Sequence, residues 1–176
     1  MEPTFRAATI GDALAIADIY NQGIAERGAT FETRPRTTHE IADKLRDVGR
    51  YPTLVAEEEG RVVGWAALSG YRPRDCYAGI AEFSIYLDRD ARGHGVGQRL
   101  LDALVGAARD LGYWKLVSRV FPFNAASRAV CRRCGFREVG ICEKHGRLDG
   151  VWTDVIIVER LIPENLTAAG AGGHEE

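Results

Sequence analysis

Apolar and polar positions repeat along the chain with two periods, which predicts a mixture of helices and strands. Thr9 with Asp12, and Thr37 with Glu40, form the Thr-x-x-acidic pattern of a capping box, so a helix is expected to begin at each of them. The first helix is predicted to run to about Gly23. Apolar residues recur at helical spacing after both boxes: Ala13, Ile16, Ala17, Tyr20 and Ile24, then Ile41, Leu45 and Val48.

Segments with a period of two predict the strands. In the strand expected at residues 81–87, alternation places Glu82, Ser84 and Tyr86 on one face. A long helix with Leu100, Leu104 and Leu111 on its apolar face is predicted after it. The other expected elements are strands at 5–8, 53–56, 62–68 (after a turn at 59–60) and 116–121, a helix at 125–134 ended by Gly135, and an antiparallel pair at 138–143 and 151–161. This order is that of an α/β (α+β) protein.

Length and composition narrow the class of protein. The chain has 176 residues, of which 45% are hydrophobic, which suits a single domain over residues 1–165. The small, Gly-rich and acidic stretch 166–176 is expected to be a disordered tail. The formal net charge is −2 and no long basic run occurs, so nucleic acid is not an expected partner. No apolar stretch is long enough to span a membrane, and the first residues lack the apolar core of a secretory signal, so we expect a cytoplasmic protein.

The four cysteines do not predict a metal site. Cys131 and Cys134 form a lone C-x-x-C in an expected helix, and no second pair of cysteines or histidines lies at ligand spacing. We expect reduced structural thiols and no metal.

The most informative segment is the glycine-rich turn Arg92-Gly93-His94-Gly95-Val96-Gly97, between a strand and an amphipathic helix. Glycines let the backbone approach a ligand closely, and the first N–H groups of a helix point at an anion such as a pyrophosphate. The turn lacks the G-x-G-x-x-G spacing of a dinucleotide fold and the Lys-Ser/Thr ending of a P-loop. It fits the pattern R/Q-x-x-G-x-G/A.

That pattern and the order of elements resemble the GNAT superfamily of N-acetyltransferases over residues 5–161. Six segments resemble its phosphinothricin and arsinothricin N-acetyltransferase branch: residues 20–24, 29–33, 71–77, 81–86, 144–146 and 151–155. The resemblance implies a central sheet of about seven mostly antiparallel strands flanked by helices, acetyl-CoA as co-substrate, a small amino acid as acceptor, and a homodimer.

The resemblance also implies roles for individual residues. Glu82 matches the glutamate that acts as general base. The substrate would meet Phe31, Thr33, Arg72 and Arg74. Acetyl-CoA would meet the backbone of Ile85, Tyr86 and Leu87, the turn Arg92, Gly93, His94, Gly95, Val96 and Gly97, and then Asn124 and Ser127. The position that usually carries a tyrosine general acid holds Cys131, and Asp149 stands where phosphinothricin enzymes have a histidine, which favours arsinothricin as substrate.

The chemistry of Glu82 agrees with a role as base, because an α-ammonium must lose a proton before it can attack a thioester. Glu82 is a lone carboxylate in an apolar strand, where burial favours its neutral form; the other interpretation is a sheet carboxylate paired with an arginine. N–H groups of residues 85–87 could hold the oxyanion if the strand separates from its neighbour. Arg72 and Arg74, two apart around Pro73 in an extended segment, could point the same way and hold an anion together, or could be solvated loop charges.

Several other residues are expected to be structural. Trp65 and Trp152 are predicted to serve packing, Trp152 either in the core or in the contact between two subunits. Phe31 suits either the core or the substrate pocket. His94 and His145 are interpreted as surface residues. Asp154 is expected to hold a neighbouring strand or an arginine.

Three hypotheses about function remain open. The first is acetylation of the α-amine of an anionic, glutamate-like amino acid, and the second is acetylation of another amine, such as an aminoglycoside, a polyamine or a protein N-terminus. The third is a catalytically silent module that senses acyl-CoA. The pair Arg72 and Arg74 favours the first, since a polycationic substrate would need an acidic cleft.

Overall fold

A seven-stranded sheet forms the centre of the protein, which is described here by a computed structural model over residues 2–46 and 48–168. The strand order is β1-β2-β3-β4-β5-β7-β6. All neighbours pair antiparallel except β4 and β5, which run parallel. This confirms the predicted α+β fold. The strands are β1 (Thr4–Ala7), β2 (Thr53–Glu58), β3 (Arg61–Gly70), β4 (Ile80–Leu87), β5 (Lys115–Val120), β6 (Arg137–Leu148) and β7 (Val151–Leu161).

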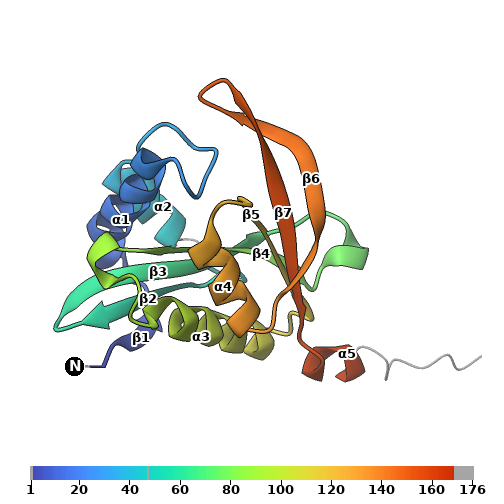
Figure 1. Ribbon diagram of the computed structural model, residues 1–176. Coiled ribbons are helices and arrows are strands. Elements are labelled where there is room, and N and C mark those ends of the chain that lie inside the picture. Colours follow the sequence, from blue (N-terminus) through green and yellow to red (C-terminus); the bar gives the residue numbers. More distant parts are fainter. Residues whose placement is uncertain (1, 47, 169–176) are drawn as a thin grey trace, which may run out of the picture.

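Helices cover both faces of the sheet, as Figure 1 shows. On one face, α1 (Ala13–Glu26) and α2 (Thr38–Arg46) enclose a core cluster with β2 and β3 that includes Ile16, Val55 and Trp65. On the other face, α3 (Val96–Asp110) and α4 (Ala125–Arg133) build the larger cluster around Leu100, Leu101, Leu104 and Phe83. A short helix, α5 (Glu164–Ala168), follows β7.

Both predicted capping boxes are present. The backbone N–H of Thr9 donates to Asp12 at 2.7 Å, and that of Thr37 donates to Glu40 at 2.7 Å. Each carboxylate satisfies an N–H group that the first helical turn leaves without a partner. The boxes therefore fix where the first two helical segments begin.

Some boundaries differ from the prediction. The first helix continues past Gly23 to Glu26, where Arg27 in the left-handed region (φ 57°) ends it. Val48 and Leu111 are exposed because they lie beyond the last turns of α2 and α3. Helix α5 was not predicted, and it includes residues 166–168 of the expected tail; residues 169–176 lie outside the described part of the chain.

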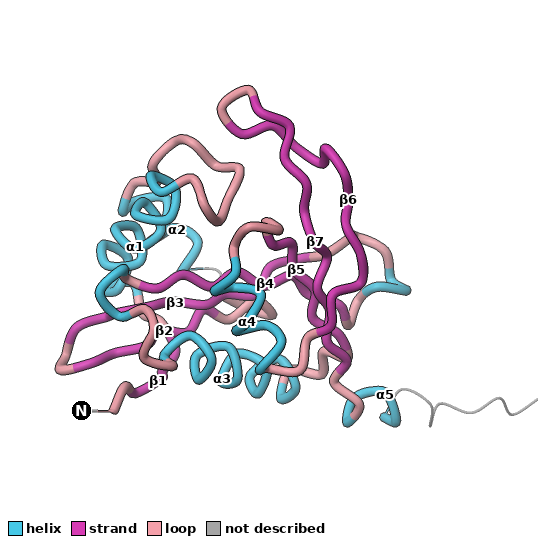
Figure 2. The backbone as a smooth tube through the Cα atoms, in the orientation of Figure 1, coloured by secondary structure: helices cyan, strands magenta, loops and turns pink. Residues whose placement is uncertain are grey.

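The hairpin of β6 and β7 rises from the rest of the molecule beside the loop that follows α1 (Figure 2). Strand β6 is longer than predicted because it contains two irregularities in its pairing with β7, at Glu138/Gly140 and at Cys142/Gly146.

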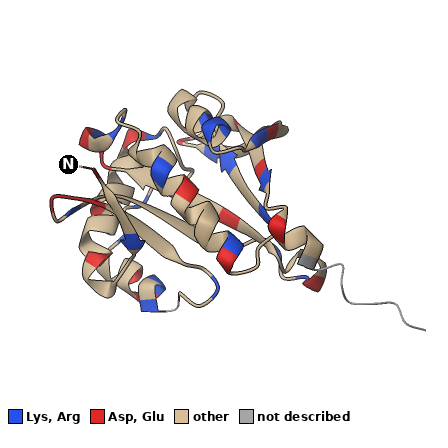
Figure 3. Ribbon diagram, turned by 90° about the horizontal axis from the view of Figure 1, so that it is seen from below, with Lys and Arg blue, Asp and Glu red and all other residues tan. Residues whose placement is uncertain are grey.

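Acidic and basic residues are interspersed over the helices in the view from below (Figure 3). No helix within residues 2–46 and 48–168 is long and apolar enough to cross a membrane.

Candidate active site

Strands β4 and β5 separate in the middle of the sheet. They pair only from Ile80–Lys115 to Glu82–Val117, although β4 continues to Leu87 and β5 to Val120. Beyond the last pair, the Ser118 hydroxyl donates to the carbonyl of Phe83 at 2.9 Å. The opening that the sequence could only suggest is therefore present.

The backbone of β4 presents polar groups to this opening. Because successive residues of a strand direct their N–H and C=O groups to opposite sides, the bond from Ser118 to Phe83 places the groups of Phe83, Ile85 and Leu87 on the β5 side. The Leu87 carbonyl already accepts from the guanidinium of Arg92 at 3.2 Å. The N–H groups of Ile85 and Leu87 remain directed toward the opening, where they can donate to a ligand.

The glycine turn begins α3 at one end of the opening. Gly95 is the N-cap of the helix and has φ 81°, a conformation that a residue with a Cβ adopts only at a cost. Of the predicted turn residues, Arg92, Gly93, Gly95 and Gly97 line the groove. His94 is exposed and Val96 is packed in the core, so within the described ranges their side chains do not line it.

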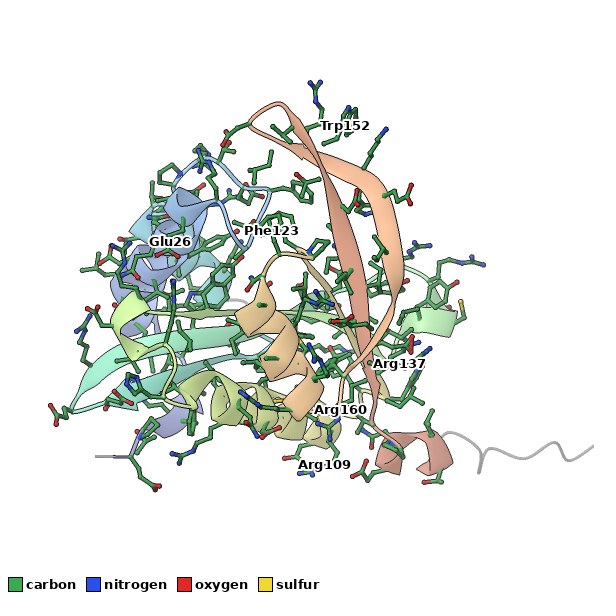
Figure 4. All side chains as sticks on the ribbon, viewed as in Figure 1. Glu26, Arg109, Phe123, Arg137, Trp152 and Arg160 are labelled. Atoms are coloured by element: carbon green, nitrogen blue, oxygen red, sulfur yellow. The ribbon has the colours of Figure 1, made fainter. Side chains whose placement is uncertain are left out.

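A groove of about 710 Å³ runs along the opening from this turn to α4. Asn124 is the N-cap of α4, and its side chain accepts from the N–H of Ser127 at 3.1 Å. Both residues line the groove, as Ile85, Tyr86 and Leu87 do, so the predicted cofactor residues of β4 and α4 come together. Phe123, exposed just before α4, also lines it and lies between the α1 side and β7 in Figure 4; sequence reasoning missed it.

A second cavity, of about 390 Å³, adjoins the groove, and we call it the acceptor cavity. Glu82, Phe31 and His145 line it. Phe31 also packs edge-to-face on Phe121 at 4.9 Å between ring centroids, so it belongs both to a small core cluster and to the cavity wall. The two cavities share Ala29, Phe83, Ser84, Tyr86, Ser118 and Arg119.

Glu82 is paired with a cation. Its Oε2 accepts from Nη2 of Arg119 at 2.7 Å, and the Glu82 side chain is 26% exposed. Glu82 is therefore only partly buried and has a charged partner at hydrogen-bond distance. Sequence reasoning anticipated an arginine partner only as the alternative to catalysis, but the cavity lining shows that Glu82 has both a partner and access to a ligand.

Arg72 and Arg74 do not form the expected extended pair. The N–H of Arg74 donates to the carbonyl of Arg72 at 2.8 Å, which closes a tight turn around Pro73. Their guanidinium groups lie over different rings, Arg72 over Tyr71 at 5.3 Å and Arg74 over Tyr77 at 5.7 Å. In the described part of the chain, neither arginine lines the two cavities, and neither does the exposed Thr33.

Cys131 lies on the buried face of α4, and burial raises the pKa of its thiol to about 11. Among the described residues it lines neither cavity, so it is not placed to protonate a leaving group there. Cys134 is buried too, and burial raises its pKa to about 12. Both thiols are free, as predicted. Within residues 2–46 and 48–168, no three His, Cys, Asp or Glu side chains gather in a group that could hold a metal ion.

The irregularity in β6 explains why His145 reaches the acceptor cavity. Lys144 has φ 47°, and its N–H donates to Asp154 of β7 at 2.7 Å, so Asp154 holds the neighbouring strand as expected. A bulge of this kind redirects the next side chain, and His145 faces the cavity. Asp149 instead pairs with Arg27 at 2.8 Å, outside both cavities as far as the structure describes them. His145 is exposed, as the surface interpretation expected, and it also lines the acceptor cavity, which sequence reasoning missed.

Comparisons with known proteins agree with this geometry. The sequence matches the Acetyltransferase (GNAT) family over residues 16–136. It is 34% identical over 161 residues to a phosphinothricin N-acetyltransferase of Alcaligenes faecalis, with 89% of this chain and 81% of that protein covered. It is 32% identical over 162 residues to an L-methionine sulfoximine/L-methionine sulfone acetyltransferase of Pseudomonas aeruginosa, with 90% and 94% covered.

A solved structure shows the same fold with a ligand. The phosphinothricin acetyltransferase of Sinorhizobium meliloti, in complex with AcCoA, superposes with a TM-score of 0.85 at 34% identity, covering 92% of this chain and 89% of that one. The family match covers most of the chain, and the fold and the relatives agree with it. The chain belongs to the acetyltransferase (GNAT) family and is an N-acetyltransferase.

Proposed function

We propose that this enzyme transfers the acetyl group of acetyl-CoA to the α-amine of a glutamate-like amino acid with an anionic γ-group, phosphinothricin or arsinothricin, and so confers resistance to that compound. The observation that carries the proposal is the position of Glu82, in a cavity that adjoins the groove along the separated strand β4. The names of the relatives support an amino-acid acceptor.

The groove fits the parts of acetyl-CoA, which supplies the activated acetyl thioester. The glycine turn and the start of α3 offer N–H donors to the pyrophosphate. The N–H groups of Ile85 and Leu87 suit the polar pantetheine arm and the oxyanion that forms at the thioester. Asn124 uses its side-chain oxygen for capping, so its amide nitrogen remains to donate to the arm.

Glu82 acts in this proposal as the general base. The Glu82 carboxylate, held in place by Arg119, can accept a proton from the α-ammonium, directly or through water. The proton for the leaving thiolate comes from a group other than Cys131. Tyr86 lines both cavities, and burial raises the pKa of its phenol, so its hydroxyl stays protonated and can donate.

The anionic γ-group is assigned to Arg72 and Arg74, with Thr33 and Phe31 beside the substrate. The loop that carries Arg72 and Arg74 follows β3. The last residues of β3, Ser69 and Gly70, pair with Glu82 and Ala81. The loop thus starts next to the proposed base, and the two exposed guanidinium groups could reach the distal end of an acceptor that extends from the cavity.

The lining of the acceptor cavity favours a second candidate, an amino acid with a neutral γ-group such as methionine sulfone. Phe31 and Phe121 form an apolar wall, and Glu32 adds a negative charge. These groups suit a neutral side chain better than an anionic one. The two candidates differ in whether Arg72 and Arg74 take part.

Release of free thiol from acetyl-CoA, measured with arsinothricin, phosphinothricin, glutamate, methionine sulfone and a polyamine, tests the proposal. We expect the highest kcat/KM for an anionic amino acid. Arg74→Ala should raise the KM of the anionic acceptors about tenfold or more, since a charge-assisted contact contributes about 1.5–3 kcal/mol, and should leave that of methionine sulfone unchanged. Arg46→Ala, on the exposed end of α2, is the matched control. Better turnover of the polyamine would contradict the proposal.

We also propose that the protein is a homodimer, on the basis of the family resemblance. The exposed apolar side chains of the β6–β7 hairpin are consistent with a covered surface.

A further inference from the structure

The acceptor cavity contains a cation to which neither the resemblance nor the comparisons give a role. Arg119, on β5, is the one lysine or arginine among the described residues that lines this cavity, and it also lines the groove. It lies on the sheet face that carries Glu82, because Leu116 and Val120, of the opposite parity, are buried in the α3 side of the core. Arg119 therefore lies where the two substrates would meet.

The ion pair with Glu82 occupies only part of the guanidinium. Nη2 donates to Glu82, whereas Nε and Nη1 have no hydrogen bond to any described residue. The side chain is 51% exposed and lines the cavity, so these donors are available to a ligand. A guanidinium has five donors in a planar fork and can hold two carboxylates at once.

The chemistry of an α-amino acid supplies the second carboxylate. Its amine and its carboxylate are attached to the same carbon, so an acceptor whose amine approaches Glu82 must bring its own carboxylate close to Glu82 as well. Two carboxylates at such a distance repel each other unless a cation lies between them. Arg119 is that cation.

We propose that Arg119 binds the α-carboxylate of the acceptor and makes the enzyme selective for α-amino acids over simple amines. The proposal rests on the proposed function only in taking an α-amino acid as acceptor, and it does not depend on the γ-group. Arg119 holds Glu82 through Nη2 and receives the substrate carboxylate on its remaining donors. A bidentate contact of this kind increases the affinity for the acceptor and also fixes the position of its amine.

The test compares each acceptor with the amine that lacks its α-carboxylate. Phosphinothricin and L-methionine sulfone are each paired with the corresponding decarboxylated amine, and kcat/KM is measured for all four with wild type, Arg119→Ala and Arg119→Lys. We expect Arg119→Ala to lower the ratio of kcat/KM, amino acid over amine, by about 10- to 100-fold for both pairs. Arg119→Lys, which keeps the charge but loses the fork, should retain part of the ratio.

The ratio separates substrate binding from a merely structural role. If Arg119 only positions Glu82, its loss lowers the rate for amino acid and amine alike, the ratio stays constant, and the proposal is overturned. Equal kcat/KM of amino acid and amine with the wild-type enzyme would also overturn it. Arg137→Ala removes an exposed arginine of β6 from another part of the molecule (Figure 4) and should leave the ratio unchanged.

The same measurements distinguish failure of the proposed function. If the wild type prefers methionine sulfone to phosphinothricin, the assignment of an anionic γ-group to the substrate is wrong. The ratio of kcat/KM for methionine sulfone over its decarboxylated amine still tests the role of Arg119. Unfolding of Arg119→Ala would show in its melting curve, and Arg119→Lys then provides the ratio.

Discussion

At the scale of single residues, Glu82 and Arg119 show how one contact can serve two purposes. The pair looks like an ordinary cross-strand ion pair, and exposed pairs of this kind contribute about 0–1 kcal/mol to stability. Under the proposed function, its position at the junction of two cavities gives the pair a chemical use as well, because the proposed base and the carboxylate of the substrate would be held by the same cation.

Glu82→Gln should abolish most turnover at neutral pH, because an amide cannot accept the proton of the α-ammonium. We expect a rate about 10²- to 10⁴-fold lower, the usual contribution of a general base. Thiol release from acetyl-CoA measures the rate, and a thermal shift with acetyl-CoA should show that the co-substrate still binds. The rate should recover toward alkaline pH, where the free amine is abundant; an unchanged rate at pH 7 would exclude Glu82 as base.

The cysteines should differ sharply in reactivity. Burial raises the pKa of Cys131 to about 11 and that of Cys134 to about 12, so at pH 8 almost none of either thiol is the reactive thiolate. Maleimide labelling followed by mass spectrometry should modify the exposed Cys76 in the native protein and reach Cys131 and Cys134 only after denaturation. Rapid native labelling of Cys131 would contradict the buried position.

At the scale of elements, the glycine turn and the bulged strand β6 illustrate what a sequence pattern can and cannot predict. Three glycines before an amphipathic helix predicted an anion site, and the helix start and the groove lie where the pattern placed them. The position of His145 in the wall of the acceptor cavity depends on an irregular pairing of β6 with β7, which Asp154 holds. No periodicity in the sequence reveals this irregularity.

The same limit applied to Arg72, Arg74 and the separation of β4 from β5. The residue before a proline favours extension, but the turn around Pro73 and the stacking on Tyr71 and Tyr77 are set by loop contacts. Strand separation depends on the partner strand, which is distant in sequence. The local elements could therefore be predicted, whereas the relative placement of side chains from β4, β5 and β6 could not.

Gly95→Val should weaken acetyl-CoA binding. The substitution strains the positive φ and places a side chain where the pyrophosphate would lie against the backbone. Wild type should gain about 2.7 kcal/mol of unfolding free energy at 100 times the dissociation constant, and the variant should gain much less. Gly60→Val is the matched control, because Gly60 has a similar φ of 77° and an equally open position in the β2–β3 turn. It should lose comparable stability and keep the full shift with acetyl-CoA.

Gly146→Ala should weaken binding of the acceptor and leave binding of acetyl-CoA unchanged. A Cβ at Gly146 would lie 2.7 Å from Cζ of Phe31, so the ring must shift and the wall of the acceptor cavity changes with it. Overpacking of this kind costs about 1–3 kcal/mol, and we expect the acceptor KM to rise roughly tenfold. Gly140→Ala on the same strand meets nothing within 4 Å and should behave as wild type. An unchanged KM in Gly146→Ala would show that Phe31 does not shape the acceptor site.

At the scale of the whole molecule, the β6–β7 hairpin carries apolar side chains that the described residues leave exposed. For Trp152, which the sequence left open between the core and a subunit contact, the structure excludes the core: the residue is 56% exposed and lies under the guanidinium of Arg147 at 5.1 Å. Val151 and Ile141 of the same hairpin are 66% and 61% exposed. Figures 1 and 4 show the hairpin projecting from the sheet with Trp152 at its end. Exposed large apolar residues on a projecting hairpin are consistent with a surface that another protein covers.

A second copy of the chain is the partner that the family resemblance indicates, so the protein should sediment at twice its mass of 19.3 kDa at micromolar concentration. If the hairpin forms the interface, Trp152→Glu should shift the protein toward monomer, because an isologous contact places the new charge on both sides of the apolar surface. Leu14→Glu changes a similarly exposed residue on α1 and should leave the dimer intact. A single 19.3 kDa species for the wild type would refute the dimer, and a stable Trp152→Glu dimer would place the interface elsewhere.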